Sequence, residues 1–148
     1  MSGIAGIIET QDVSYPLYYA LHALQHRGQE AAGISTFDGE KAWIYKAPGQ
    51  LSEVFSDDKL RTLPGFCGVA QVLYTEKASR GKNENIQPLN FSFKGHNLSV
   101  SVSSSLINSE SLRSEYAVKG HIVSTTSDAE IMAAIIAQEL SGGATPRD

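Results

Sequence analysis

The sequence predicts an α+β fold in which helices pack on largely antiparallel sheets. Two strand-like segments, 31–37 and 41–47, flank Asp38-Gly39, a dipeptide that favours a tight hairpin turn. Segment 91–102 alternates apolar and polar residues on either side of Gly95, which predicts a second hairpin with one buried face. Segments of helical periodicity separate these pairs, and that arrangement is typical of helices layered on antiparallel sheets.

The N-terminal half begins with a short apolar run, residues 3–9, which predicts a buried strand. Ser14 is expected to cap a helix that ends at Gly28, because apolar residues recur between them at helical spacing. These apolar residues are Leu17, Ala20, Leu21 and Leu24. A short amphipathic helix is expected at 53–61 and a strand at 66–74.

The C-terminal half opens with a long polar stretch, 75–89, which predicts a loop before the second hairpin. A helix is expected at 109–119 and a short strand at 121–125. Ser127 then offers an N-cap for a last helix over 128–140.

Length and composition describe one ordinary globular domain, which we assign to residues 1–140, followed by a flexible tail at 141–148. The net charge of −4 gives no reason to expect nucleic acid or an anionic membrane as a partner. No apolar run reaches the ~20 residues of a membrane span, and residues 1–5 do not open a signal peptide. The single cysteine, Cys67, excludes an internal disulfide. A cytoplasmic location is expected.

No cofactor is expected, and neither is a metal site. His22 and His26 lie one helical turn apart in the sequence and could share a metal ion. No third ligand accompanies them, and His26 belongs to a motif that has a structural explanation.

Five motifs follow one another from residue 2 to about residue 140: Gly3–Ile7, Leu21–Ile34, Asn85–Pro88, Leu106–Asn108 and Ser127–Glu130. In this order they resemble the class II glutamine amidotransferases, and the closest match is the glutaminase domain of amidophosphoribosyltransferase. The resemblance implies the N-terminal-nucleophile hydrolase fold, an αββα sandwich with antiparallel sheets. Because the family domain continues with further core strands, the sandwich is expected to be truncated at its C-terminal end.

The resemblance also implies four chemical roles. In the family, an N-terminal cysteine attacks the side-chain amide of glutamine, and its own α-amine acts as the base. An asparagine and a backbone amide hold the developing oxyanion. An arginine binds the substrate carboxylate and an aspartate binds the substrate ammonium.

Ser2 occupies the position of the nucleophile. Serine can serve there only if Met1 is removed to free the α-amine, and a hydroxyl is a weaker nucleophile than a thiol. The alternative is that Ser2 is only the polar end of a strand.

Two further roles lack their usual residue. Leu73, followed by Tyr74, stands where the family has the carboxylate-binding arginine, and no motif places nearby Arg80 in the pocket. Ser103 and Ser104 replace the oxyanion asparagine and the glycine after it. Loss of one preorganised donor costs on the order of 10²–10³ in rate. Alternatively, this serine run is simply the polar end of a strand.

Arg27 and Asp128 are retained from the family motifs. Asp128 matches the ammonium-binding aspartate, but the segment around it also resembles a capping box, with Ser127 as N-cap and Glu130 at the third helical position. Arg27 could be retained only because the corner between helix and strand requires it.

Three of the four roles therefore lack their residue, which predicts a pseudoenzyme: an inactive amidotransferase-like domain acting as a binding, regulatory or assembly subunit. The alternative is an active N-terminal serine amidohydrolase or amidotransferase that uses Ser2 on glutamine or another amide. Binding of free glutamine is not expected. Because open sheet edges invite pairing, we expect a homo-oligomer or a protein partner that completes the sheet. Candidate surfaces are the 91–103 hairpin and the apolar stripe at 131–136.

Overall fold

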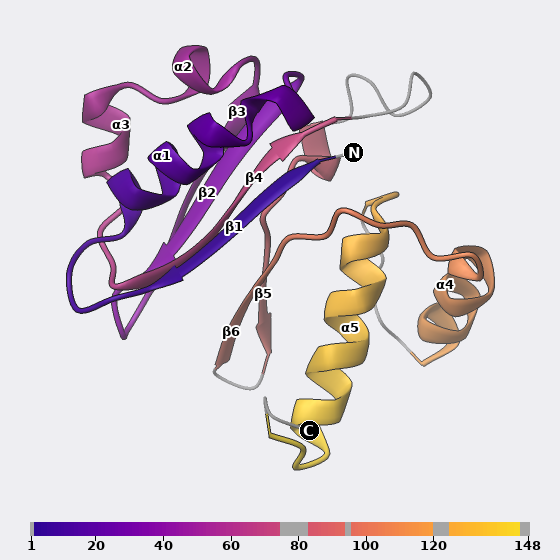
Figure 1. The fold of residues 1–148 in the computed structure, drawn as a ribbon. Helices are drawn as coiled ribbons and strands as arrows, with labels where there is room; N and C mark the ends of the chain where they lie inside the picture. Colours follow the sequence, from indigo (N-terminus) through magenta and orange to yellow (C-terminus); the bar gives the residue numbers. More distant parts are fainter. Residues whose placement is uncertain (1, 75–82, 94–95, 120–124, 146–148) are drawn as a thin grey trace.

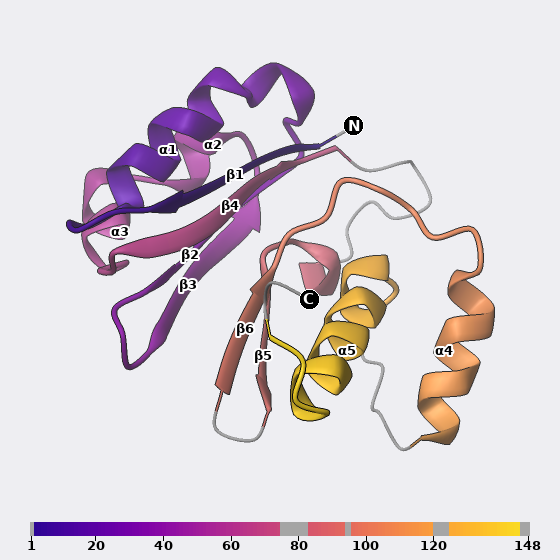
Figure 2. The ribbon, with the colours of Figure 1, turned by 60° about the horizontal axis from the view of Figure 1, so that its bottom comes forward.

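The computed structural model describes residues 2–74, 83–93, 96–119 and 125–145. In this part of the chain, helices, a four-stranded sheet, a two-stranded sheet and further helices follow one another as layers (Figure 1, Figure 2). This confirms the predicted α+β class, with antiparallel sheets between layers of helices. No helix in these ranges is long and apolar enough to cross a membrane.

The first sheet is antiparallel throughout, with strand order β1-β4-β2-β3. Its strands are β1 (Gly3–Ile8), β2 (Ala31–Phe37), β3 (Ala42–Pro48) and β4 (Cys67–Leu73). Side chains alternate between the two faces of a strand. We call the face with Ala70 and Val72 the outer face, because both belong to the core under the helices. The face with Val69 and Gln71 is the inner face, which lies toward the second sheet.

Three helices cover the outer face (Figure 1): α1 (Ser14–Ala23), α2 (Leu51–Val54) and α3 (Asp57–Arg61). Leu17 and Leu21 of α1 are fully buried and pack in one apolar cluster with Val72 and Ile34. Burial of a leucine or valine side chain contributes about 1.5–3 kcal/mol. The larger hydrophobic core therefore lies between the helices and the outer face.

Two predictions about these helices are wrong. Ser14 is the first residue of α1, and its N-cap is Val13, which is fully buried and anchored by its backbone N–H to the Gly65 carbonyl at 2.9 Å. The helix predicted at 53–61 is interrupted, because Phe55 adopts an extended backbone that buries its ring. The demand for packing at this residue overrides the helical periodicity of its neighbours.

The second sheet is the hairpin of β5 (Leu89–Phe93) and β6 (His96–Val100). One face of the hairpin packs on α5 (Asp128–Ser141), beside which lies α4 (Ser109–Val118). A small core cluster joins them, formed by Leu89, Val100, Ala129 and Ala133. Both surfaces proposed for association thus bury apolar residues against each other, although Ile136 remains 41% exposed.

Two short 3₁₀ helices complete the described elements, η1 (Gln25–Arg27) after α1 and η3 (Asn83–Asn85) before β5. The strand predicted at 121–125 lies outside the described residues except at its last position. The predicted loop at 75–89 is described only from residue 83 onward, and its last residue already belongs to β5.

Polar side chains on the facing surfaces connect the two sheets. Asn90 Nδ2 donates to Ser35 Oγ at 3.1 Å, and Ser35 Oγ lies 3.1 Å from Ser99 Oγ. Fully buried Gln71 donates from Nε2 to the Val102 carbonyl at 2.8 Å, whereas its Oε1 has no partner among the described residues. Directed hydrogen bonds therefore join the two sheets across the inner face.

Candidate functional site

The first part of the site is a cluster of hydrogen bonds around Ser2, immediately before β1. Gly3 pairs with Val72, so the start of β1 lies beside the end of β4. The backbone N–H of Tyr74 donates to Ser2 Oγ at 3.2 Å, and the backbone N–H of Ser2 donates to Ser103 Oγ at 3.1 Å. The structure thus brings together residues that are far apart in the sequence.

The carbonyl of Ser2 completes this cluster. It accepts a hydrogen bond from Ser103 Oγ at 3.1 Å and another from Arg27 Nε at 3.2 Å. The Ser103 hydroxyl therefore both accepts from and donates to the backbone of Ser2. Ser2 is only 6% exposed, and three positions singled out by the sequence, Arg27, Tyr74 and Ser103, hold it in place.

A pocket of about 180 Å³ adjoins the cluster, because Leu73 and Ser104 line it and their neighbours Tyr74 and Ser103 bond to Ser2. The remaining lining residues are Asn85, Gln87, Ser105, Thr126, Ser127, Asp128 and Ala129. None of the described lining residues is basic. Arg80, considered above as a replacement for the lost arginine, lies outside the described residues.

Asp128 borders this pocket at the first turn of α5, with 18% of its side chain exposed. Its Oδ2 accepts from the Leu106 backbone N–H at 2.8 Å, and its Oδ1 accepts a short hydrogen bond from the Ser109 hydroxyl. Arg113 Nη2 lies 3.8 Å from Oδ1 and donates to the Ser127 carbonyl at 2.7 Å. Two hydrogen-bond donors and the Arg113 guanidinium, all from the α4 region, therefore surround the carboxylate.

The capping arrangement at α5 is only partly as predicted. Ser127 is the N-cap, and its Oγ accepts from the Ala129 backbone N–H at 3.3 Å. The reciprocal half of the capping box is wrong: the Ser127 N–H donates to the Thr125 hydroxyl, and Glu130 accepts from the Thr125 N–H at 2.7 Å. Thr125 takes this role because the bend at residues 125–126 brings its N–H and hydroxyl to the first turn of the helix.

Two amide side chains connect the pocket to the rest of the fold. Asn85 Nδ2 donates to Thr126 Oγ1 at 2.8 Å. Gln87 accepts from the Val102 backbone N–H at 2.6 Å and donates from Nε2 to Ser127 Oγ at 3.4 Å. The segment before β5 is therefore bonded to the start of α5 and to the chain just after β6.

Lys46, on the inner face of β3, anchors the same segment from the other side. Its Nζ donates to the carbonyls of Ile86 at 2.5 Å and Pro88 at 3.0 Å, and burial lowers the pKa of the ammonium. A Cβ atom on Gly33 would lie 2.1 Å from the Gln87 carbonyl oxygen, so only glycine fits under this segment. Lys46 and Gly33 thus hold residues 86–88, which include the pocket residue Gln87, close to the inner face of the first sheet.

Sequence reasoning did not find Arg113, Ser109 or Lys46. Each of them contacts a residue at least 14 positions away in the chain, so no local sequence pattern indicates the contact. The only available signal was the spacing of Ser109 and Arg113 by one helical turn, which places them on the same side of α4. Across the described residues, no group of three or more His, Cys, Asp or Glu side chains could hold a metal ion.

Comparison with known proteins shows which proteins the chain is similar to. No protein-family model matches the chain. The amidophosphoribosyltransferase of Methanocaldococcus jannaschii is 39% identical over 142 residues, which cover 95% of this chain, and that of Bacillus subtilis is 37% identical over 147 residues, which cover 99%. In both cases the chain spans 30% of the relative's length.

Solved structures agree with these relatives. The Bacillus subtilis glutamine phosphoribosylpyrophosphate amidotransferase in complex with ADP and GMP has a TM-score of 0.80 at 35% identity, covering 90% of this chain and 28% of that one. A structure of the allosteric regulatory enzyme of purine biosynthesis has a TM-score of 0.84 at 36% identity, covering 92% and 29%. The chain is therefore a homologue of the amidophosphoribosyltransferases, with the N-terminal-nucleophile hydrolase fold of their glutaminase domain.

Proposed function

We propose that this chain is a catalytically silent glutaminase-like domain that acts as a binding, regulatory or assembly subunit. The observation that carries the proposal is Leu73 in the wall of the pocket that also contains Asp128. A glutamine whose ammonium faced Asp128 would need a cation for its carboxylate, and none lines the described part of the pocket. Desolvating an unpaired carboxylate is strongly unfavourable.

The Ser2 cluster supports the same proposal. A hydroxyl has one hydrogen to donate, and that of Ser103 is directed to the Ser2 carbonyl at 3.1 Å. It is therefore not free to stabilise an oxyanion, which requires a donor preorganised toward the developing charge.

An ammonia-release assay with glutamine tests the proposal. Protein purified free of host amidotransferases should release no more ammonia than a blank without protein. Ser2→Cys alone should not restore activity, because carboxylate binding and oxyanion stabilisation would still be missing and such groups act as a unit. The matched variant Ser2→Cys, Leu73→Arg, Ser103→Asn restores all three roles. Activity of the unaltered chain would contradict the proposal.

Thermal unfolding tests ligand binding separately from catalysis. A ligand raises the melting temperature only in proportion to its binding to the folded state, so glutamine at millimolar concentration should leave the unaltered chain unchanged. Leu73→Arg should gain a measurable response. A clear rise with the unaltered chain would show that the pocket still accepts the amino acid.

A second candidate is an active N-terminal serine amidohydrolase acting on glutamine or another amide. Its support is the position of Ser2, whose Oγ accepts from the Tyr74 N–H and whose nitrogen lies 3.1 Å from Ser103 Oγ. This activity requires removal of Met1, because the α-amine must be the base. Mass spectrometry of the native N-terminus separates the candidates: retained Met1 would eliminate the serine hydrolase.

We also propose that the chain associates, with itself or with a protein partner that completes the first sheet. The two edges of this sheet differ: β3 carries Lys46 and ends at Pro48, whereas β1 has neither a charge nor a proline. Ile4 and Ile8 of β1 are 37% and 82% exposed. An apolar edge strand without protective residues favours pairing with another strand.

Light scattering tests this association. Ile8→Lys should shift the protein toward the monomer, whereas Ile107→Lys, at an exposed isoleucine outside the strands, should not. A monodisperse 15.9 kDa species for the unaltered chain, unchanged by concentration, would contradict association with itself. Co-purification from the native cells tests the alternative of a different partner.

A further inference from the structure

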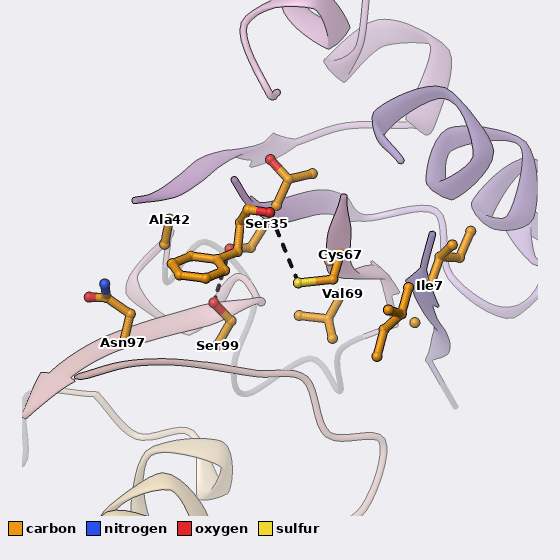
Figure 3. A pocket seen from close by; sticks show the side chains of 12 residues that line it. Ile7, Ser35, Ala42, Cys67, Val69, Asn97 and Ser99 are labelled. Carbon is orange, nitrogen blue, oxygen red and sulfur yellow. Dashed lines mark hydrogen bonds between the residues drawn. The ribbon is translucent and has the colours of Figure 1, made fainter. Parts of the chain in front are cut away.

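A larger cavity, of about 410 Å³, lies between the two sheets (Figure 3). It is bordered by the ends of β1 and β2 and the start of β4, so it lies at the opposite end of β1 from Ser2. Small-molecule sites typically have volumes of about 300–1,000 Å³ and mostly apolar walls with a few directed polar groups. This cavity has both properties and is separate from the pocket beside Leu73.

The apolar part of its wall comes from the first sheet. Phe37, Ala42, Cys67 and Val69 line it, and Figure 3 shows Cys67 and Val69 across the cavity from β6. The Cys67 thiol is directed to the Phe37 carbonyl at a sulfur-to-oxygen distance of 4.0 Å. This side therefore offers contact surface rather than hydrogen-bonding groups.

The polar part of the wall has one hydroxyl hydrogen to spare. Ser35 and Ser99 both line the cavity, and their Oγ atoms are 3.1 Å apart. Asn90 donates to Ser35, so it consumes no hydroxyl hydrogen. Of the two hydroxyl hydrogens, one forms the bond between the serines. The other has no acceptor among the described residues, whichever serine carries it.

Asn97 on β6 adds a second source of donors. Its Oδ1 accepts from the Ser92 hydroxyl at 2.9 Å, and its amide NH₂ group has no acceptor among the described residues at the rim of the cavity. No described residue that lines the cavity carries a charge at neutral pH. A carboxylate would lose its hydration here without gaining a cation, which is unfavourable, whereas a neutral acceptor would lose far less.

We propose that this cavity binds a small neutral molecule with a flat apolar body and one carbonyl-type acceptor. The body packs against Phe37 and Val69, and the acceptor receives the free hydroxyl hydrogen of the Ser35–Ser99 pair. This site is independent of whether the Ser2 region hydrolyses amides.

Three probe molecules of similar shape test the proposal by NMR titration of the full chain. Acetophenone is neutral and carries a carbonyl, α-methylstyrene replaces that carbonyl by a CH₂ group, and benzoate carries a charge. Acetophenone should shift the backbone signals of Val69 and Ser99. It should bind about fivefold more tightly than α-methylstyrene, the size expected of one net hydrogen bond. Benzoate should bind most weakly.

Variants of Ser35 and Ser99 test whether this pair has one free hydroxyl hydrogen. Ser99→Ala and Ser35→Ala should each retain the preference for acetophenone, because either single variant leaves one free hydroxyl in the cavity. The double variant should bind both neutral probes equally. Val69→Phe should fill the cavity and weaken all three probes, which provides a test that leaves the serines intact.

Several results would overturn the proposal. Equal binding of acetophenone and α-methylstyrene to the unaltered chain would show that the hydroxyl plays no part. Shifts confined to the pocket beside Leu73, or none at millimolar concentration, would show that the cavity is not a ligand site. If the double variant does not fold, the comparison of the three probes on the unaltered chain and on Val69→Phe still tests whether the cavity binds a neutral acceptor.

Discussion

The outer and inner faces of the four-stranded sheet are built from different interactions. On the outer face, Leu17 and Val72 are fully buried in one apolar cluster that contains most of the buried core. On the inner face, Ser35 and Gln71 form directed hydrogen bonds to the second half of the chain, and Val69 is only half-buried beside a cavity. Packing on one face supplies stability, while the other face holds polar groups in fixed positions.

This difference has a physical cause. Apolar burial is non-directional and scales with area, so it stabilises a layer without requiring one particular arrangement of atoms. A buried hydrogen bond contributes only about 1 kcal/mol net, but its loss leaves an unsatisfied group and costs more. The hydrogen bonds of the inner face therefore add little stability but fix the positions of the groups that they join. Fixed polar groups suit a surface that is lined with pockets.

The largest expected effect is that of a charge placed on the inner face. Gln71→Glu puts a carboxylate at a fully buried position. It should destabilise the fold by roughly 3 kcal/mol at neutral pH, because the carboxylate is unpaired and faces the Val102 carbonyl. Burial raises the pKa of a carboxyl above its unfolded value, so the loss should fade as the pH falls below the raised pKa.

Urea unfolding at a series of pH values measures this effect. Gln71→Met is the matched control, since it also loses the bond to Val102 but introduces no charge. It should cost less and show no added pH dependence. Equal costs for the two variants at all pH values would indicate that water reaches this part of the inner face.

A matched pair on β4 compares the two faces directly. Val72 lies on the outer face and is fully buried, whereas Val69 lies on the inner face and is half-buried. Val72→Ala should cost about 2 kcal/mol, from lost burial and the space left behind, and Val69→Ala about half of that. Chemical denaturation of both variants checks the ratio. Equal losses would mean that the inner face is packed as tightly as the outer one.

Arg113 tests whether hydrogen bonds hold the second half of the molecule. Its guanidinium donates to the carbonyls of Thr125 and Ser127 at 2.7 Å each, and its side chain is 21% exposed. Arg113→Met should cost about 2 kcal/mol, because charged donors are removed from partly buried acceptors. Arg61→Met is the control: Arg61 pairs with Asp57 at the surface, with 71% of its side chain exposed, and its loss should be undetectable. An equally small effect for Arg113→Met would show that the hydrogen bonds of Arg113 do not stabilise the second half of the molecule.

The smallest effect is expected at the β2–β3 turn, where the hydrogen-bonded groups are exposed to solvent. Hydrogen bonds from the Trp43 indole and from the backbone of Lys41 and Glu40 lower the pKa of Asp38 to about 2. A depressed carboxyl pKa stabilises the folded state above about pH 4, and this contribution disappears as the pH falls toward 2. NMR titration of Asp38 and of the Trp43 indole should report one shared transition. A transition near pH 4 would show that the turn is not preorganised.

The parts of the fold that were predictable from sequence are those set by local patterns. The bounds of β2 were predicted to the residue, and Gly39 adopts a positive φ of 103° in the turn. The turn itself lies one residue later than predicted, at Gly39 and Glu40 between the bonded residues Asp38 and Lys41, so β3 also begins one residue later. The helix predicted at 53–61 failed because burial of Phe55 is a property of the assembled core. Local periodicity records which residues are apolar, but not which of them the tertiary structure will bury at the expense of a helix.

The site residues also fall into those that the sequence located and those that only the tertiary structure shows. Resemblance to a family located Ser2, Ser103 and Asp128, and the structure brings the first two into contact. The donors around Asp128 were not predicted, because Arg113 reaches it only after α4 and α5 have packed together. Such contacts depend on how the elements are arranged, which neither spacing nor composition records.

The anchoring of residues 86–88 by Lys46 and Gly33 has a consequence for the order in which the molecule opens. The larger apolar cluster is formed entirely by residues between Val13 and Val72, whereas residues 83–145 are joined to it mainly through hydrogen bonds such as that of Lys46. Backbone amides of β5, β6 and α5 should therefore exchange with solvent deuterium through partial opening, before those of β2 and β4. A brief separation of the two halves would uncover the Ser2 cluster and both pockets together, so anything that binds there would also slow the opening.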